Sequence, residues 1–178
     1  MNFKKISAIA CVMTIIGGMS SATTVHAASQ YPQTGQTPVV YDNRNIVDPD
    51  GNGVWGVAIP TAITFTDENQ IADADIELVG LNGYSLSDFT QLDVDGTVQS
   101  QNAYKMIGEG SASGSEASYS YQLKSTTFTA DGEEQDIEQL TLSAPKQEGT
   151  ATLKTKGTKK GQHKDKLTFT FTGTSQLK

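Results

Sequence analysis

The sequence has one cysteine, Cys11, and two histidines, His26 and His163, among its 178 residues. Cys11 and His26 both fall within the first 27 residues. The remainder of the chain therefore has no thiol and forms no disulfide. It also has too few nitrogen and sulfur ligands for a structural zinc site, which normally takes four. A chain without disulfides must be stabilised by its hydrophobic core.

Charged residues are also scarce, at 19% of the chain against 36% for hydrophobic residues. Most of the polarity comes from uncharged Thr, Ser, Gln, Asn and Gly, a composition that favours strands and turns over helices. The sequence contains no phosphate-binding glycine loop, dinucleotide-binding glycine motif, Cys-x-x-Cys motif or Asn-x-Ser/Thr acceptor. With a pI of about 4.7, the chain is not expected to bind nucleic acid.

The first 27 residues have the three parts of a secretory signal peptide. Lys4 and Lys5 precede an apolar run from Ile6 to Met19, and Val25-His26-Ala27 forms a small-residue cleavage site. The apolar run is shorter than the roughly 20 residues that a membrane-spanning helix needs. We therefore expect residues 1–27 to be removed and the mature protein to be secreted, with no membrane span.

Residues 28–53 contain three of the five prolines and show little hydrophobic periodicity. Few apolar side chains are available there to offset the entropy of ordering the backbone. We expect a flexible N-terminal linker, within which Val39–Tyr41 can add a short strand, followed by one folded domain over residues 54–178.

Hydrophobic side chains recur with a period of two after position 54. In residues 166–172, Leu167, Phe169 and Phe171 alternate with threonines, which is the pattern of a half-buried strand. Further strands are expected at residues 55–59, 63–66, 75–79, 92–98, 104–107, 117–123, 126–129, 137–143 and 150–155.

Glycine-containing turns separate these segments, at Asn82-Gly83, Asp95-Gly96, Asp131-Gly132 and Lys160-Gly161. Residues 85–92 are interpreted as a loop or a single helical turn. Many short strands joined by such turns predict an all-β fold, an antiparallel β-sandwich of immunoglobulin-like or jelly-roll type. The expected core consists of Trp55, Val57, Ile59, Ile63, Phe65, Ile76, Leu78, Val94, Tyr119, Tyr121, Leu123, Leu140, Leu142, Leu153, Leu167, Phe169 and Phe171.

Charge is distributed unevenly along the chain. Residues 42–138 carry 18 acidic and three basic groups, whereas residues 146–178 carry eight lysines against two acidic groups. A basic edge is expected near the C-terminal strands, formed by Lys154, Lys156, Lys159, Lys160, Lys164 and Lys166. This edge is a candidate site for a polyanion such as a wall teichoic acid, or else a solvated row of lysines that protects a sheet edge.

Catalytic signals are weak. His163 lies between lysines in the segment 159–166, and we expect it in a solvated loop rather than in a Ser-His-Asp triad. Acidic residues two apart on a strand share a face, so Asp75 with Glu77, or Asp93 with Asp95, is the remaining route to carboxylate catalysis. In an acidic exported protein such pairs usually form a solvated face. We do not expect an enzyme, and we name no catalytic residue.

The segment 48–53 resembles the start of a calcium loop. Asp48, Asp50 and Asn52 place oxygen side chains at alternate positions, and Gly53 stands at position six. An EF-hand has a bidentate Glu at position twelve, where this chain has Ile59. A turn before the first strand is favoured over a calcium site, and no other cofactor is expected.

Residues 39–67, with Trp55-Gly56-Val57 among them, and residues 162–170 resemble small secreted surface proteins of Gram-positive bacteria. These are adhesin-like proteins or companions of the WxL cell-wall proteins. The chain has a single Trp, in Trp-Gly-Val rather than in two Trp-x-Leu motifs, and no LPxTG motif. The resemblance implies a protein held at the cell wall without covalent attachment.

These observations favour a secreted, wall-associated, non-enzymatic protein that acts in adhesion or in the assembly of surface complexes. Its expected partners are cell-wall polymers, other surface proteins, or a host or glycan ligand. One alternative is a carbohydrate-binding module in which Tyr84 and Tyr104 stack on sugar rings. Another is a subunit that polymerises when the segment Val39–Tyr41 pairs with the open sheet edge of a neighbour.

Overall fold

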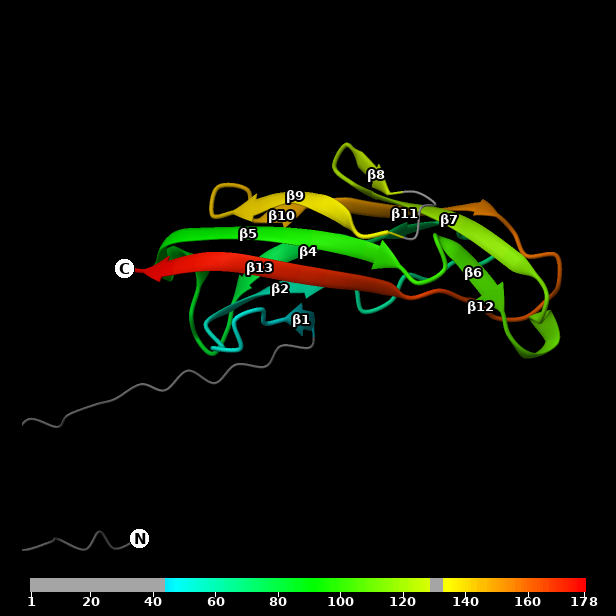
Figure 1. Cartoon of the computed structure of the whole chain (residues 1–178), viewed down its shortest axis with the longest axis horizontal. Helices are drawn as coiled ribbons and strands as arrows, with labels where there is room; N and C mark the ends of the chain where they lie inside the picture. The colour runs from blue at the N-terminus through cyan, green and yellow to red at the C-terminus, as the bar shows by residue number, and fades with distance from the viewer. Residues whose placement is uncertain (1–43, 129–132) are drawn as a thin grey trace, which may run out of the picture. The chain divides into compact units, whose positions relative to one another are not determined.

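The computed structural model describes residues 44–128 and 133–178, and this part of the chain is built from antiparallel strands (Figure 1). The first sheet has the order β1-β2-β4-β10, comprising β1 (Asn45–Val47), β2 (Trp55–Ile59), β4 (Ile76–Gly80) and β10 (Lys146–Gln147). The second has the order β12-β6-β7-β11-β3, comprising β12 (His163–Lys164), β6 (Lys105–Gly108), β7 (Glu116–Leu123), β11 (Gly149–Thr155) and β3 (Ile71–Asp73).

A further strand, β8 (Thr126–Phe128), also pairs with β7. The third sheet has the order β13-β5-β9, comprising β13 (Leu167–Leu177), β5 (Phe89–Ser100) and β9 (Gln135–Thr141). Two short 3-10 turns, η1 (Leu86–Asp88) and η2 (Gly110–Ala112), complete the described elements. The predicted all-β antiparallel sandwich is confirmed. None of the described helical segments is long and apolar enough to cross a membrane.

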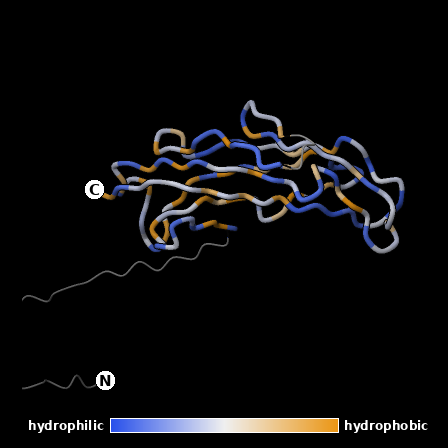
Figure 2. Tube along the Cα trace, in the orientation of Figure 1, coloured by the Kyte–Doolittle hydropathy of each residue, from blue (hydrophilic) through white to orange (hydrophobic). Residues whose placement is uncertain are grey.

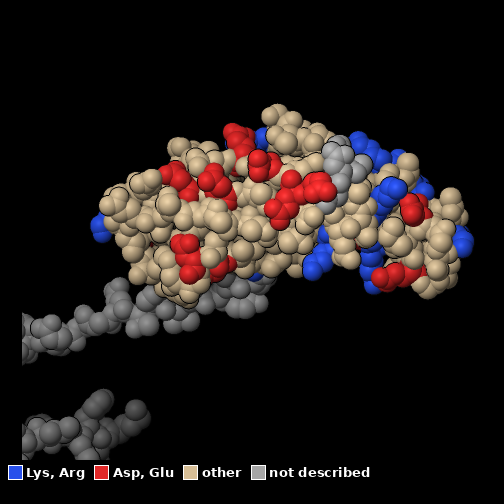
Figure 3. All heavy atoms as spheres, in the orientation of Figure 1, with Lys and Arg blue, Asp and Glu red and all other residues tan. Residues whose placement is uncertain are grey.

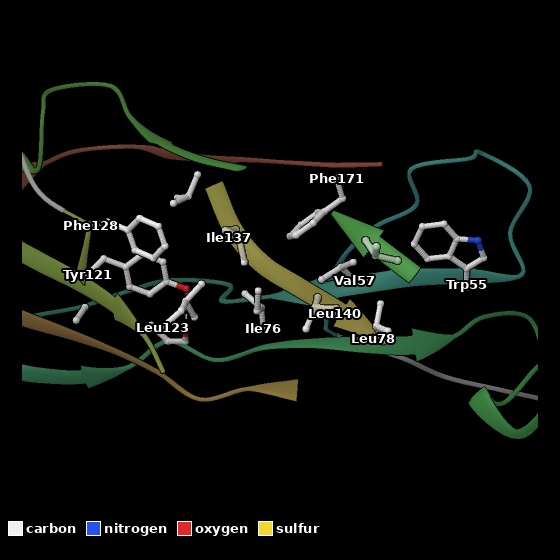
Figure 4. Packing of buried hydrophobic residues seen from close by; sticks show 14 of the residues in the cluster. Trp55, Val57, Ile76, Leu78, Tyr121, Leu123, Phe128, Ile137, Leu140 and Phe171 are labelled. Carbon is white, nitrogen blue, oxygen red and sulfur yellow. Dashed lines mark hydrogen bonds between the residues drawn. The ribbon is translucent and has the colours of Figure 1, made fainter. Parts of the chain in front are cut away.

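The hydrophobic core lies where the third sheet packs against the other two (Figure 4). Trp55 and Ile76 come from the first sheet, Tyr121 from the second, and Val94 and Phe171 from the third. Contacts between sheets are direct, since the Tyr121 and Phe169 rings meet edge to face with centroids 6.0 Å apart. Figure 2 shows hydrophobic and hydrophilic residues alternating along many strands, as the period of two predicts.

Two neighbouring stretches of chain pass from the first sheet to the second at the same place. β3 continues through Ala74 and Asp75 into β4, and β10 continues through Glu148 into β11. The Ala74 N–H donates to the Gly149 carbonyl at 2.9 Å, and the Tyr121 hydroxyl donates to the Ala74 carbonyl at 2.8 Å. We call residues 74–75 and 148–149 the sheet corner.

Asp75 holds this corner through two hydrogen bonds. It accepts the Gly149 N–H at 2.7 Å and lies 2.7 Å from Lys146 Nζ. Partial burial raises the pKa of the Asp75 carboxyl, but the hydrogen bonds from Lys146 and Gly149 and the lysine charge lower it further, so the net pKa is below its ordinary value of 3.8. The carboxylate therefore stabilises the folded state above that ordinary value, and this contribution is lost as the pH falls through the lower folded pKa.

We expect Asp75→Asn to unfold at a lower urea concentration than the wild type at pH 7, with the difference shrinking below about pH 4. Urea midpoints measured by circular dichroism between pH 7 and pH 3 test this. Asp73→Asn is the matched control because Asp73 is exposed on the neighbouring strand β3. A constant difference between wild type and Asp75→Asn down to pH 3 would contradict the assignment.

The first strand begins earlier in the chain than the sequence predicts, and one of the predicted turns is part of a strand. β1 lies within the expected linker 28–53, yet it pairs with β2 from Asn45↔Ile59 to Val47↔Val57. Gly96 is not in a turn but in the middle of β5, where it pairs with Phe171 and a side chain at this position would overlap that ring. Residues 63–66 form no strand.

The loop at residues 85–92 contains the single 3-10 turn η1, after which β5 begins at Phe89. Leu153 is only half-buried and lies outside the main core cluster, whereas the unpredicted Leu92, Val98 and Phe128 are fully part of it. The expected signal peptide, the segment Val39–Tyr41 and the turn Asp131-Gly132 lie outside the described residues.

Candidate binding surface and pocket

The six lysines expected to form a basic edge gather at one end of the second sheet. Lys154 lies at a bulge near the end of β11, and Lys164 belongs to β12. Lys156, Lys159 and Lys160 stand in the connection between β11 and β12, and Lys166 directly precedes β13. In Figure 3, basic side chains cluster over the end of the molecule where β6, β7, β11 and β12 meet. We call these six lysines the basic end.

Only part of this charge is neutralised. Lys156 pairs with Asp67 at 3.3 Å, and Lys164 pairs with Glu109 at 2.6 Å. Lys159 Nζ donates to the Ser113 carbonyl at 2.6 Å. This hydrogen bond orients the side chain but does not neutralise its charge. Within residues 44–128 and 133–178, the exposed Lys154, Lys160 and Lys166 have no acidic partner. We call these three the unpaired lysines.

On the face that Figure 3 shows, acidic side chains gather over the third sheet and its neighbourhood. Asp93 accepts the Gln91 amide at 2.7 Å, Asp95 accepts the Gln139 amide at 3.0 Å, and Glu138 pairs with Lys124 at 3.2 Å. These carboxylates lie on an exposed polar face. Likewise, Asp75 serves the sheet corner and not a carboxylate pair with Glu77.

A pocket of about 330 Å³ opens beside the basic end. Its lining comes from β1, from the end of β2 and the segment after it, from β6 and β7, from β12 and the residue after it, and from the start of β13. We call the apolar and aromatic side chains of this lining the wall, and its polar side chains, Asn45, Thr61, His163, Lys164 and Asp165, the rim. Fourteen residues line it: Asn45, Ile59, Pro60, Thr61, Ala62, Ile63, Phe65, Met106, Tyr119, His163, Lys164, Asp165, Leu167 and Phe169.

Asp165 is the most tightly held polar group of this pocket. Its Oδ2 accepts the Ser100 hydroxyl at 2.6 Å and the Tyr119 hydroxyl at 2.7 Å, and its Oδ1 accepts the Asn102 N–H at 3.0 Å. Burial, with the neighbouring Asp165 charge, raises the pKa of Tyr119 well above its ordinary value. The tyrosine therefore stays protonated and remains a donor to the carboxylate.

Tyr104, a predicted stacking residue, is buried close to this group. It is 2% exposed and its ring packs edge-on against Tyr119, with centroids 5.6 Å apart. Burial, and then the charge of Asp165, raise the pKa of Tyr104 to about 12. A ring enclosed in this way has no free face for a sugar, so Tyr104 does not serve in surface stacking. Tyr84, by contrast, is 41% exposed.

His163 is half-buried and not in a solvated loop as expected. Its Nε2 lies 3.0 Å from Ser115 Oγ and its Nδ1 lies 3.2 Å from the Gly161 carbonyl. Ser115 is 3% exposed, and its Oγ also accepts the N–H groups of Thr158 and Lys159 at 2.7 and 3.2 Å. The serine proton is therefore left for His163, and the pair anchors the connection between β11 and β12 to the β6–β7 hairpin.

The segment proposed as a calcium loop forms a hydrogen-bonded turn. Asp48 accepts the N–H groups of Gly51 and Gly53 at 2.9 and 3.0 Å, and Asn52 Oδ1 accepts the Val54 N–H at 3.1 Å. Asp50 Oδ2 accepts the indole N–H of Trp55 at 2.9 Å. Within the described ranges, no three His, Cys, Asp or Glu side chains gather as metal ligands. Calcium binding by Asp48, Asp50 and Asn52 stays the less favoured alternative to this turn.

Sequence reasoning identified the lysines but not the pocket. The pocket joins segments separated by as many as 124 positions, from Asn45 to Phe169. One signal was present, since Asp165 is the only acidic residue between Lys154 and Lys178. A lone carboxylate in a lysine-rich segment often has a structural or binding role.

No family model, curated protein or solved structure matches this chain.

Proposed function

We propose that this protein is a secreted, non-enzymatic surface protein that is retained at the bacterial cell wall through the basic end, and that acts there in adhesion or in the assembly of surface complexes. The observation that carries the proposal is the placement of three unpaired lysines, Lys154, Lys160 and Lys166, at one end of an otherwise acidic protein. Their charges are available to an anionic polymer.

The uneven distribution of charge over the molecule supports this assignment. A chain of net charge -7 is repelled as a whole by a polyanion, so binding requires that the cations be concentrated on one surface. The basic end meets this requirement because its lysines come from β11, from β12, from the connection between these strands and from the residue before β13. In the Gram-positive wall, which the sequence resemblance implies, the abundant polyanions are teichoic acids. Because salt screens exposed charges, binding of the lysines to such a polyanion is expected to weaken as the salt concentration rises.

A lysine-to-glutamine triple variant tests the proposal. We expect Lys154→Gln with Lys160→Gln and Lys166→Gln to bind a teichoic-acid-bearing wall preparation about tenfold more weakly, since each exposed charge contributes on the order of 0.5 kcal/mol. Co-sedimentation with the wall preparation measures the bound fraction. Adding 0.5 M NaCl, or removing the teichoic acid, should abolish binding by the wild type.

The matched control removes three lysines from elsewhere, as Lys124→Gln with Lys146→Gln and Lys178→Gln. Both triple variants change the net charge equally. The control also breaks the pairs Lys124–Glu138 and Lys146–Asp75, so circular dichroism must show that it is folded before its binding is compared. Equal losses in the two variants would show a general charge effect and would contradict a defined basic end. Binding by the wild type that survives 0.5 M NaCl would contradict an electrostatic site.

The strand-exchange alternative stays a prediction because its donor segment, Val39–Tyr41, is outside the described residues. Among the described strands, β13 pairs with β5 alone, which leaves its other edge without a neighbouring strand.

A further inference from the structure

The pocket beside the basic end has the construction of a ligand site and is not needed for polyanion binding. Its volume of about 330 Å³ falls at the small end of the range for ligand pockets, about 300 to 1,000 Å³. That size accommodates a single ring with its substituents.

The wall is apolar and partly aromatic. Phe65, Phe169 and Tyr119 contribute rings, and Ile63 and Met106 contribute aliphatic surface. Phe65 lies 5.9 Å from Tyr119 between ring centroids, and Phe169 packs against Phe171 at 6.3 Å, so the rings are fixed by the core behind them. Such a wall can pack against the C–H face of a ring without reorganising.

The rim supplies hydrogen-bonding groups that are not fully used. The side chains of Asn45 and Thr61 are exposed, and no described residue hydrogen-bonds to them. Asp165 Oδ1 accepts a single bond, from Asn102, so it has capacity for another donor. Because three donors already hold Asp165, it can accept from a ligand without first losing side-chain entropy.

These groups discriminate between ligand classes. A wholly apolar ligand would bury the Asp165 carboxylate and the Asn45 amide against hydrocarbon, which is unfavourable. A phosphate or carboxylate would face the Asp165 charge. A small cation would find a single carboxylate in the lining, that of Asp165, which three donors already hold. A neutral ring that carries hydroxyl groups satisfies both the apolar wall and the polar rim.

We propose that this pocket binds one uncharged sugar ring. Ring hydroxyls donate to the Asp165 carboxylate, and the Asn45 amide and the Thr61 hydroxyl make further hydrogen bonds to the ring. The C–H face of the sugar packs against the aromatic side chains of the pocket. The proposal does not rest on polyanion binding, since none of the three unpaired lysines lines the pocket. The proposed sugar site therefore differs from the one predicted from the sequence: it is this pocket and not the surface around the exposed Tyr84.

Saturation-transfer NMR with the methyl glycosides of glucose, galactose and N-acetylglucosamine tests the proposal on the full mature chain. We expect saturation transfer to the C–H protons of at least one glycoside. The double variant Asn45→Ala with Thr61→Val should weaken that binding about tenfold, because it removes two hydrogen-bonding groups from exposed positions. The control Asn69→Ala with Thr127→Val makes the same chemical changes at exposed positions that do not line the pocket.

The outcomes separate this site from the basic end. The lysine triple variant should bind the glycoside normally, and the Asn45 and Thr61 variant should bind the wall preparation normally. An absence of transfer to all three glycosides would overturn the sugar assignment. Undiminished glycoside binding by the Asn45 and Thr61 variant, or an equal loss in its control, would overturn the assignment to this pocket.

Discussion

Replacing Trp55 with alanine is expected to lower the free energy of unfolding by about 3 to 5 kcal/mol, the range for the loss of a large buried aromatic side chain. Trp55 is completely buried, and its indole N–H donates to Asp50 at 2.9 Å. Its ring lies against Gly173 of β13, where any side chain would overlap it. The substitution thus opens a cavity between the first and third sheets.

Urea unfolding followed by far-ultraviolet circular dichroism measures this loss, because the variant has no tryptophan left as a fluorescent probe. Tyr84→Ala is the control, since Tyr84 is an exposed aromatic residue outside the core cluster. We expect that variant to stay within about 0.5 kcal/mol of the wild type. A loss below about 1 kcal/mol for Trp55→Ala would mean that the indole is not part of the core.

Replacing Gly149 with valine is expected to cost about 3 kcal/mol, at the upper end for overpacked positions. A Cβ atom at this position would overlap the carbonyl oxygen of Ala74, which is backbone and cannot rotate away. Separating the two chains would also disturb the hydrogen bonds from Ala74 to Gly149, from Gly149 to Asp75 and from Tyr121 to Ala74. The whole sheet corner would have to shift.

Gly51→Ala provides the comparison for this prediction. Gly51 has a φ of 63° with open space around its missing side chain, so its replacement introduces backbone strain of about 1 kcal/mol but no overlap. Urea midpoints of both variants separate the two causes. If Gly149→Val is no less stable than Gly51→Ala, the close approach of the two chains at the corner is not a constraint on the fold.

The parts of the fold that follow from the sequence are those set by alternation along one strand. Tyr119, Tyr121 and Leu123 all face the core, as their spacing in β7 predicts. Phe171 is buried and Leu167 and Phe169 are half-buried, while the threonines between them are exposed. A period of two reports which face of a strand is covered, so these assignments need no knowledge of the partner strand.

The parts that could not be predicted depend on segments distant in sequence. Asp95-Gly96 has the composition of a turn, but pairing with β13 and close packing against Phe171 keep it extended within β5. β1 is three residues long and is set by pairing with β2, not by a hydrophobic pattern of its own. Composition near a glycine describes local preference, and tertiary pairing overrides it here.

The candidate site divides in the same way. Lysines near one another in the sequence were expected on one edge, and the strand pairing places them together at the basic end. Tyr104 was expected near the surface, but the φ of 60° at this residue accompanies a tight turn after β5 in which its ring enters the core. The pocket is formed by six separate segments of the chain, and no spacing of residues in the sequence predicts that they come together.

The sheet corner also determines how the protein loses its structure. Because β3 runs into β4 and β10 runs into β11, the first and second sheets share two uninterrupted stretches of backbone. Unfolding of one of these sheets therefore pulls strands out of the other. At the sheet corner, neither of these two sheets can open without moving the other. Damage at any point of the corner is therefore expected to destabilise both sheets together, with a single transition for the two and little partly open material exposed to proteases.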